Sequence, residues 1–445
     1  MIVRKFTALL ALTTLTFCLQ IRGSEPYEPP PQYKVTDVIP PDVTPGELFQ
    51  IDDTVVASNF YYYFHVASKF GNYEVASVNL LRTRAHEIEV LTQNPDDPGT
   101  GEFADSVKTE LTANAKGVVK AVAAPVKTVK AVATGIKRDS QNAIDMLFRK
   151  NRNQPKEAFF IGEERRKLAC AVGLDLYSTN PAVQDFLTAH AKARTAGTTF
   201  VSVSFSITTT VVPVLSPVGW AISAGKYRDQ AYAKVDTLSA IDLYRYNDDL
   251  LKSMDVDKEL RVRFLEYPDF TPRQKTEIVA ALKSLEKLSD KNDFIAAVQE
   301  FHPVEGIWPV ECAAMLAKFD NAGDAVTSVS ASGPALSARS VSGKDVVVFP
   351  ADVLYWNYDA AKVFESFAPG KADGQRVCVV SGQITSRARA ELEKRGFVVH
   401  ERYLFDAAPA APITPTASVA PAAEATSNKI PESRAEFHVA HQGVD

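Results

Sequence analysis

Few residues of this chain have the types and the spacing that enzyme chemistry requires. Ser223 and Lys226 match the Ser-x-x-Lys spacing, in which a lysine can help to deprotonate a nucleophilic serine. The Ser-Asp-Asn and Lys-Thr-Gly sequences that accompany this motif in such enzymes are missing from the chain. The pair therefore does not predict a catalytic serine, and we predict no catalytic residue elsewhere.

A second candidate is the turn that contains Ser381, Gly382 and Thr385. It follows the β-branched run RVCVV and precedes SRARAELEKRG, which has the composition of a helix ended by Gly396. A turn between a strand and a helix can bind an anion, because the first N–H groups of the helix have no partner within it. Capping of the helix by Thr385 or Ser386 explains the same residues equally well.

Metal and thiol chemistry have little support in the sequence. His438 and His441 are spaced for one face of a helix, but they have no acidic or thiol residues as companions, so we predict neither a metal nor another cofactor. Cys170, Cys312 and Cys378 each lie in an apolar pattern that favours a buried, inert thiol. A disulfide between Cys170 and Cys312 stays open as an alternative.

The strongest pattern in the chain is a tandem repeat, VVKAVAAPVK followed by TVKAVATGIK, over residues 118–137. It lies in a basic stretch, 116–156, which contains ten Lys and Arg against two Asp and so has a charge of +8. Because the whole chain has a formal charge of −5, the remainder sums to −13. On a helical wheel the valines and lysines occupy adjacent arcs, which predicts a basic amphipathic helix. The residues predicted to contact a membrane or partner are Lys116, Lys120, Val122, Val126, Lys127, Val129, Lys130, Ile136 and Lys137.

Two interpretations of this helix stay open. Its valines could pack on the core of the protein while its lysines face water, or the helix could lie on an anionic membrane surface or a partner protein. It is not predicted to span a bilayer, because lysines at its middle would be costly there. Nucleic acid is not an expected partner, since no aromatic residues are interleaved with the lysines for base stacking.

The first residues have the pattern of a secretory signal peptide. Arg4 and Lys5 precede an uncharged, mostly apolar run from Phe6 to Ile21, and Gly23 is a small residue suited to cleavage. We therefore expect an exported protein, periplasmic or associated with the cell envelope. The sequence favours no particular oligomeric state.

Along the rest of the chain the patterns predict an α+β protein. An alternating apolar run with a turn after it predicts a β-hairpin over 59–78, and a helix follows to Leu91. Helical patterns dominate afterwards, with Asn180-Pro181 and Thr271-Pro272 as helix starts. Short β-branched runs then alternate with a helical segment. The expected organisation is a signal peptide at 1–23, a Pro-rich leader at 24–50, a hairpin plus helix at 51–104, the basic amphipathic segment at 105–156, a mainly helical domain at 157–323, a small α/β unit at 324–405 and a disordered Ala/Pro-rich tail at 406–445.

One segment inside the helical region differs from its surroundings. Residues 195–225 contain no charged residue, and Val201, Val203, Phe205 and Ile207 alternate with Ser and Thr. This period of two predicts a strand with one face on the core. A hairpin inserted into a membrane is the alternative, although one amphipathic strand leaves its edges unpaired in lipid.

The order of these parts is similar to that of a group of exported bacterial proteins without a described activity. The resemblance rests on FYYYFHVASKFGNYEVASVNLLRTRAHEIEVL, on the Lys- and Val-rich segment, on KLACAVGLDLYSTNPAVQDFL and on RFLEYPDFTPRQKTEIVAAL, and it covers most of residues 51–400. It implies export but no catalytic residues. The segment after Arg194 is richer in Ser and Thr here than in that group.

These observations lead to one hypothesis and one alternative. The hypothesis is an exported, non-enzymatic envelope protein whose basic helix docks on an anionic membrane or on a partner. The alternative is an enzyme or small-ligand binder with a site at Ser381, Gly382 and Thr385.

Overall fold

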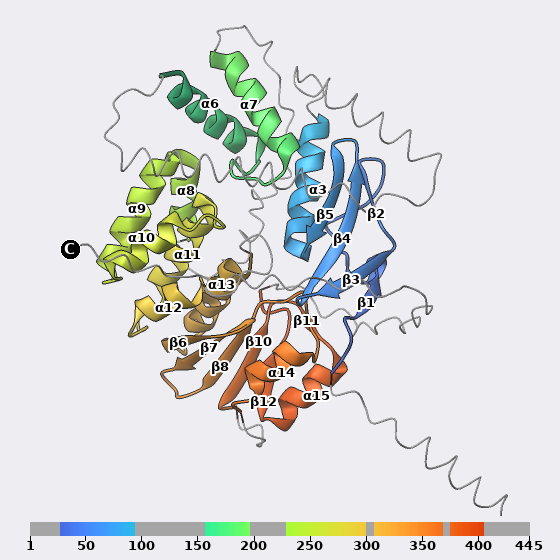
Figure 1. Ribbon diagram of the computed structural model, residues 1–445, viewed down its shortest axis with the longest axis vertical. Coiled ribbons are helices and arrows are strands. Elements are labelled where there is room, and N and C mark those ends of the chain that lie inside the picture. Colours follow the sequence, from blue (N-terminus) through green and yellow to red (C-terminus); the bar gives the residue numbers. More distant parts are fainter. Residues whose placement is uncertain (1–26, 94–155, 196–227, 300–306, 368–373, 405–445) are drawn as a thin grey trace, which may run out of the picture.

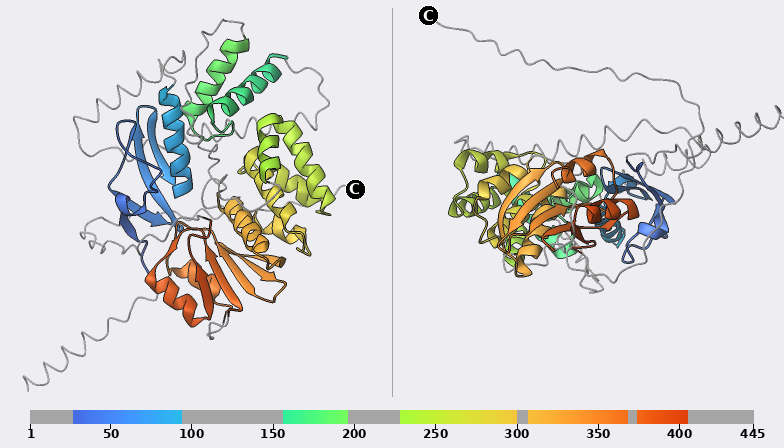
Figure 2. Two further views of the ribbon diagram at one scale, coloured as in Figure 1. Left: turned by 180° about the vertical axis from the view of Figure 1, so that it is seen from behind. Right: turned by 90° about the horizontal axis from the view of Figure 1, so that it is seen from below.

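The computed structural model describes residues 27–93, 156–195, 228–299, 307–367 and 374–404. Within these ranges the chain forms an N-terminal sheet with one long helix, a central set of helices and a C-terminal sheet with its own helices (Figures 1 and 2). The expected α+β class is confirmed. Buried apolar side chains from all three parts form one continuous core.

The N-terminal sheet is antiparallel and is built around its longest strand, β4. Tyr61 to Ser68 alternate between the two faces over most of this strand, as a half-buried strand requires. β4 pairs with β5 across a tight turn, which is the hairpin expected from the sequence, and it also pairs with β2 and β3. The strands are β1 (Gln32–Lys34), β2 (Phe49–Ile51), β3 (Thr54–Ser58), β4 (Tyr61–Ser68) and β5 (Gly71–Ala76).

The expectation that residues 24–50 form a leader without a core is wrong for the part that the structure describes. β1 pairs with β3, and the short helix α2 (Val35–Val38) follows it. Tyr33 on β1 is buried, with its ring 5.3 Å from that of Tyr62 in an edge-to-face arrangement. The physical reason is that the prolines flank β1 instead of interrupting it, so its backbone groups are free to pair.

The helix α3 (Val78–Gln93) packs against β4 and β5. It begins directly after Ser77, which is fully buried and has a φ of +82°. The Ser77 hydroxyl accepts a hydrogen bond of 3.1 Å from the Leu80 N–H. The backbone N–H of Ser77 donates to the Tyr62 carbonyl oxygen at 2.8 Å. These bonds offset the strain of a left-handed backbone at a non-glycine residue.

The central part of the described chain is helical, as the sequence predicts. Both predicted helix starts are confirmed: Asn180 Oδ1 accepts from the Ala182 N–H, and Thr271 forms a reciprocal capping box with Gln274. The helices are α6 (Lys156–Val172), α7 (Pro181–Thr195), α8 (Arg228–Thr237), α9 (Ala240–Ser253), α10 (Lys258–Glu266), α11 (Pro272–Ser284), α12 (Lys291–Ala297) and α13 (Ile307–Asn321).

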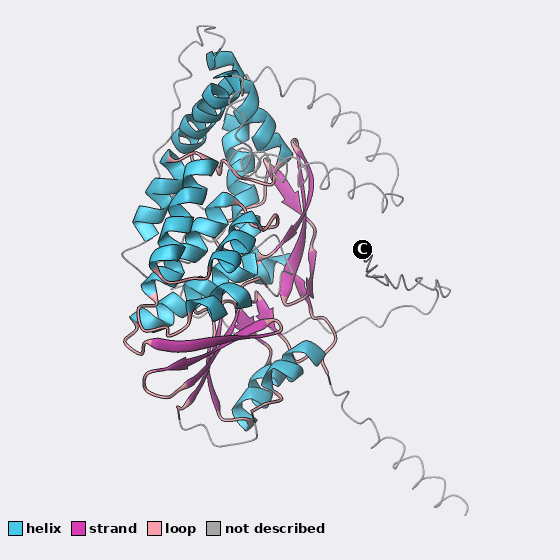
Figure 3. Cartoon of the chain, turned by 60° about the vertical axis from the view of Figure 1, so that its left-hand side comes forward, coloured by secondary structure: helices cyan, strands magenta, loops and turns pink. Residues whose placement is uncertain are grey.

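The C-terminal sheet has the strand order β12-β10-β8-β7-β6, in which β8, β10 and β12 run parallel. α13 packs on one face of this sheet, while α14 and α15 lie on the other (Figure 3). The strands of this sheet are β6 (Val326–Ser332), β7 (Ala335–Ser340), β8 (Asp345–Phe349), β10 (Arg376–Val380) and β12 (Phe397–His400). β9 (Val353–Leu354) and β11 (Gln383–Ile384) pair with each other in a separate two-stranded parallel sheet. The helices of this part are α14 (Tyr358–Phe364) and α15 (Ser386–Lys394).

Several sequence predictions fall outside the described residues. They concern the signal peptide at 1–23, almost all of the basic segment 105–156, the uncharged segment 195–225 after its first residue, and the tail at 406–445. Thr195 is the last residue of α7, and Lys156 is the first of α6.

Candidate functional site

The carboxyl ends of β8 and β10 are the natural place to look for a ligand, since open α/β sheets bind ligands at this edge. Here the N-terminal sheet covers that edge. Val353 donates its N–H to the Phe60 carbonyl oxygen at 3.1 Å, and Gln383 Nε2 donates to the Tyr62 hydroxyl at 2.6 Å. The edge is therefore a junction between the two sheets.

The candidate anion-binding residues Ser381 and Gly382 lie inside this junction. Ser381 is 3% exposed, and its Oγ accepts a hydrogen bond of 2.7 Å from the Ala351 N–H. At Gly382 a Cβ atom would lie 2.1 Å from the Asp352 carbonyl oxygen. Glycine is thus needed for the close approach of two backbone segments, which fill the space where its side chain would lie.

The third candidate, Thr385, caps α15 and contacts the side-chain carboxyl group of Glu28. Its Oγ1 accepts from the Ala388 N–H at 3.2 Å and donates to Glu28 Oε2 at 2.7 Å. The Trp356 N–H donates to the same carboxylate oxygen at 2.5 Å. The sequence analysis missed Glu28, because no local pattern connects it with a helix more than 350 residues away.

Two further acids that the sequence analysis missed, Glu311 and Asp352, lie at the centre of the junction. Glu311 on α13 accepts a hydrogen bond of 2.6 Å from Asn79 Nδ2 of α3, and its Oε2 lies 3.0 Å from Ser381 Oγ. Asp352 accepts from the Tyr62 N–H at 2.9 Å and from the Val78 N–H at 3.2 Å. A single acid inside the apolar run IWPVECAAML was the only sequence signal for Glu311.

Burial changes the acidity of both groups. Burial, together with the smaller effect of the nearby Asp352, raises the pKa of Glu311 to about 8. Burial also raises the pKa of Asp352 to about 7, although the Tyr62 and Val78 N–H groups oppose this shift. In the described part of the chain, Tyr61 Oη and Asn79 Oδ1 are buried nearby without a hydrogen-bond partner. This concentration of polar groups can hold a proton, but its burial keeps it from a dissolved substrate.

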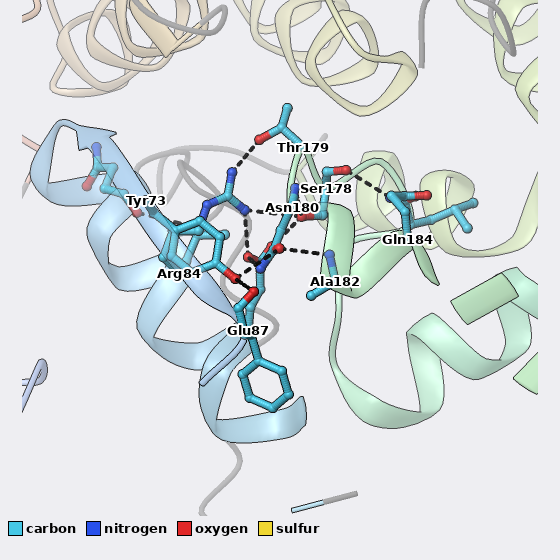
Figure 4. A network of polar contacts seen from close by, with 12 residues as sticks. Tyr73, Arg84, Glu87, Ser178, Thr179, Asn180, Ala182 and Gln184 are labelled. Carbon is cyan, nitrogen blue, oxygen red and sulfur yellow. Dashed lines mark hydrogen bonds and ion pairs between the residues drawn. The ribbon is translucent and has the colours of Figure 1, made fainter. Parts of the chain in front are cut away.

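A second polar cluster joins α3 to the loop between α6 and α7 (Figure 4). Arg84 Nη1 and Glu87 Oε2 form a buried ion pair of 2.6 Å. Glu87 also accepts from Asn180 Nδ2 at 2.9 Å and from the Ser178 hydroxyl, while Arg84 donates to Thr179. The pair is therefore surrounded by donors and acceptors that complete its hydrogen bonds, as a buried ion pair requires.

The other end of the same loop is fixed by a third buried cluster. Arg273 on α11 is 3.0 Å from Asp175, measured from Nε to Oδ1, and its Nη2 is 3.5 Å from Asp236 Oδ1 on α8. Residues 173–180 thus connect α3 on one side with α8 and α11 on the other. This loop positions the α6–α7 hairpin.

The basic and apolar contact residues between Lys116 and Lys137 lie outside the described ranges. All three cysteines of the described chain are free thiols, and Cys170 is exposed, so its predicted burial is wrong, as is the alternative disulfide. Cys170 lies on α6, and its thiol is near enough to Asp236 of α8 and Arg273 of α11 for their charges to affect its pKa, which partial burial raises.

The described residues contain neither a candidate membrane span nor a candidate metal site. None of their helices is both long and apolar enough to cross a bilayer. Their His, Cys, Asp and Glu side chains form no group of three that could hold a metal ion. Comparison of the chain with protein-family models, with curated proteins and with solved structures gives no match.

Proposed function

We propose that this chain is an exported, non-enzymatic protein of the cell envelope that docks reversibly on an anionic membrane surface through its basic segment, residues 116–137. The charge distribution supports the proposal, because residues 116–156 have a charge of +8 in a chain of charge −5. A concentrated basic patch is attracted to anionic lipid even when the whole protein is acidic.

The observation that carries the proposal is the placement of the elements that border the basic and the uncharged segments. Residues 94–155 connect α3 to α6, and residues 196–227 connect α7 to α8. α6, α7, α8 and the C-terminal end of α3 all lie in the half of the molecule away from the C-terminal sheet (Figures 1 and 3). The basic segment and the uncharged, Val- and Ser-rich segment therefore join the fold in the same half.

The expected affinity follows from the charges. Each lysine near an anionic headgroup contributes about 1 kcal/mol, and apolar side chains add to this when they enter the interface. Three lysines changed to glutamate should therefore weaken binding by about 100-fold or more, since their attraction is replaced by repulsion.

The test is co-sedimentation of the full mature protein with vesicles that contain an anionic phospholipid, compared with vesicles of a neutral phospholipid. We expect binding to the anionic vesicles that decreases with salt and is lost on Lys120→Glu, Lys127→Glu and Lys130→Glu together. The control variant carries the same charge change at exposed lysines of the described fold, Lys258→Glu, Lys287→Glu and Lys362→Glu.

Three outcomes would count against the proposal. They are no salt-sensitive binding of the intact protein, equal binding to neutral vesicles, and equal loss of binding in the control variant. Circular dichroism of both variants distinguishes lost binding from lost folding.

A further inference from the structure

The hydrogen bonds around Ser381 indicate the protonation state of Glu311. Ser381 Oγ accepts from the Ala351 N–H, and it also lies 2.9 Å from the Ala351 carbonyl oxygen and 3.0 Å from Glu311 Oε2. A serine hydroxyl has one proton to donate. If Glu311 were ionised, one of these two oxygen–oxygen approaches would have no hydrogen between its atoms.

A neutral Glu311 removes this conflict. Its carboxylic acid can donate to Ser381 Oγ, and Ser381 can then donate to the Ala351 carbonyl oxygen, so each short contact contains one proton. The other oxygen, Oε1, stays free to accept from Asn79 Nδ2 at 2.6 Å. All of these contacts are buried.

The charged surroundings lead to the same conclusion. Glu311 is 2% exposed and, within the described ranges, has no ion-pair partner. The nearby Asp352 accepts two backbone N–H groups, an arrangement that favours its ionised form. Of two adjacent acids in such a site, the one with only side-chain partners keeps the proton.

Among the residues that the structure describes, the other titratable groups around Glu311 do not supply a compensating positive charge. Tyr61 on β4 and Cys312 on α13 are buried, and burial raises the pKa of both. Arg82 on α3 acts on Asp352 and forms an ion pair with Asp42. On α11, which packs against α13, Arg273 contacts Asp175. Lys275, also on α11, donates a hydrogen bond from Nζ to the Leu265 carbonyl oxygen. On the C-terminal sheet, Arg339 forms an exposed ion pair with Asp345.

We propose that Glu311 is a proton-binding site within the junction between the N-terminal sheet and the C-terminal unit. Glu311 holds the proton while the two parts are packed together and releases it when the junction opens. The groups that contact Glu311 explain the coupling. Asn79 lies in the first turn of α3, whereas Ser381 and Asp352 follow β10 and β8. Ionised Glu311 would repel Asp352 and leave Ser381 with one proton for two acceptors, which weakens the contact between the two parts. This proposal is independent of membrane docking.

The test uses Glu311→Gln in the full mature protein, with Glu393→Gln as a matched control at an exposed position. Glutamine has nearly the shape of the neutral acid, and its amide can accept from Asn79 and donate to Ser381. Infrared spectroscopy at about pH 7.5, above the pKa of Asp352 of about 7 and below the pKa of Glu311 of about 8, should show the C=O band of a buried carboxylic acid in the wild type and in Glu393→Gln, and its loss in Glu311→Gln. An unchanged band in Glu311→Gln would overturn the proposal.

The pH dependence of unfolding provides the second measurement. The folded protein keeps the proton up to a pH of about 8, whereas the unfolded chain loses it near the ordinary Glu pKa of 4.5. Between these values the unfolding equilibrium constant of the wild type should increase about tenfold per pH unit relative to Glu311→Gln. Parallel curves for the two proteins over this range would contradict a bound proton at Glu311.

Amide hydrogen exchange tests the opening of the junction. The Ala351 and Val78 N–H groups donate to Ser381 and Asp352. At pH 6 we expect these amides to be equally protected in the wild type and in Glu311→Gln. At pH 9 we expect lower protection in the wild type than in Glu311→Gln. Equal protection of the two proteins at both pH values would show that ionisation of Glu311 does not open the junction.

Discussion

Glu28 and Thr385 are 357 residues apart in the chain, yet Thr385 Oγ1 donates a hydrogen bond of 2.7 Å to Glu28 Oε2. The same oxygen accepts from the Trp356 N–H. The beginning of the described chain is thereby fixed to the start of α15, beside the ring contact between Tyr27 and Tyr358.

Removal of this carboxylate should destabilise the protein. Glu28→Ala leaves the Trp356 N–H and the Thr385 hydroxyl without their acceptor, and the expected loss is about 1–3 kcal/mol in the free energy of unfolding. Urea denaturation measures the change. Glu47→Ala, at an exposed position of the same N-terminal region, should leave the free energy within about 0.5 kcal/mol of the wild type. A loss at Glu28 no larger than at Glu47 would show that this contact does not hold the chain end in place.

The buried Arg84–Glu87 pair should be sensitive to the loss of one partner. Glu87→Ala leaves the Arg84 guanidinium buried without its carboxylate, and we expect a loss of about 3–5 kcal/mol. Glu89→Ala, on an exposed position of the same helix, is the matched control and should have little effect. The double variant Arg84→Leu/Glu87→Leu should recover part of the loss, because both buried charges are removed together. Full additivity of the single changes Arg84→Leu and Glu87→Leu in the double variant would argue that the pair is not coupled.

Lys275 should make the stability depend on pH in the alkaline range. Burial lowers its pKa from 10.5 to about 7, although Glu266 and Asp269 oppose the shift. Between pH 7 and 10.5 the unfolded chain therefore binds a proton that the folded protein does not, so this group makes the protein more stable as the pH increases. Relative to the wild type, Lys275→Met should be most stabilising at pH 7 and below, and its advantage should decrease toward pH 10.5. Denaturation of both proteins across this range, with Lys258→Met as the exposed control, checks the prediction. A constant difference between wild type and Lys275→Met would contradict it.

Gly382 should tolerate no side chain. An alanine Cβ there would overlap the backbone of Ala351 and Asp352, so Gly382→Ala should cost about 3 kcal/mol or more or prevent folding. Gly46→Ala is the matched control, because a Cβ at Gly46 meets no atom within 4 Å. Thermal denaturation compares the two. A mild effect at Gly382 would mean that the junction has space for an additional group. That result would support the alternative hypothesis of a small-ligand site at this turn.

The predicted helix starts and the predicted strands of the C-terminal sheet depend on neighbours in the chain, and these predictions are confirmed within the described residues. Thr271, Pro272 and Gln274 define a helix start because the cap, the proline and the capping box act within one turn. The β8, β10 and β12 strands were recognisable from β-branched runs, and α15 ends before Gly396, which has a φ of +78°. The β6–β7 hairpin was missed, since its Ser- and Ala-rich strands have weak β-propensity and gain their pairing from the sheet.

The amino-acid sequence by itself determined the α+β class, the helix starts, the parallel strand runs and the separation of basic from acidic charge, because each of these depends on residue type and short-range spacing. Only the tertiary structure decided which polar residues meet. Glu28 with Thr385, Glu311 with Asn79 and Ser381, and Arg273 with Asp175 come from distant parts of the chain, and no periodicity encodes their pairing. The tertiary structure also decided that Ser381 and Gly382 belong to a buried junction, because the N-terminal sheet covers the edge at which an isolated α/β unit would be open.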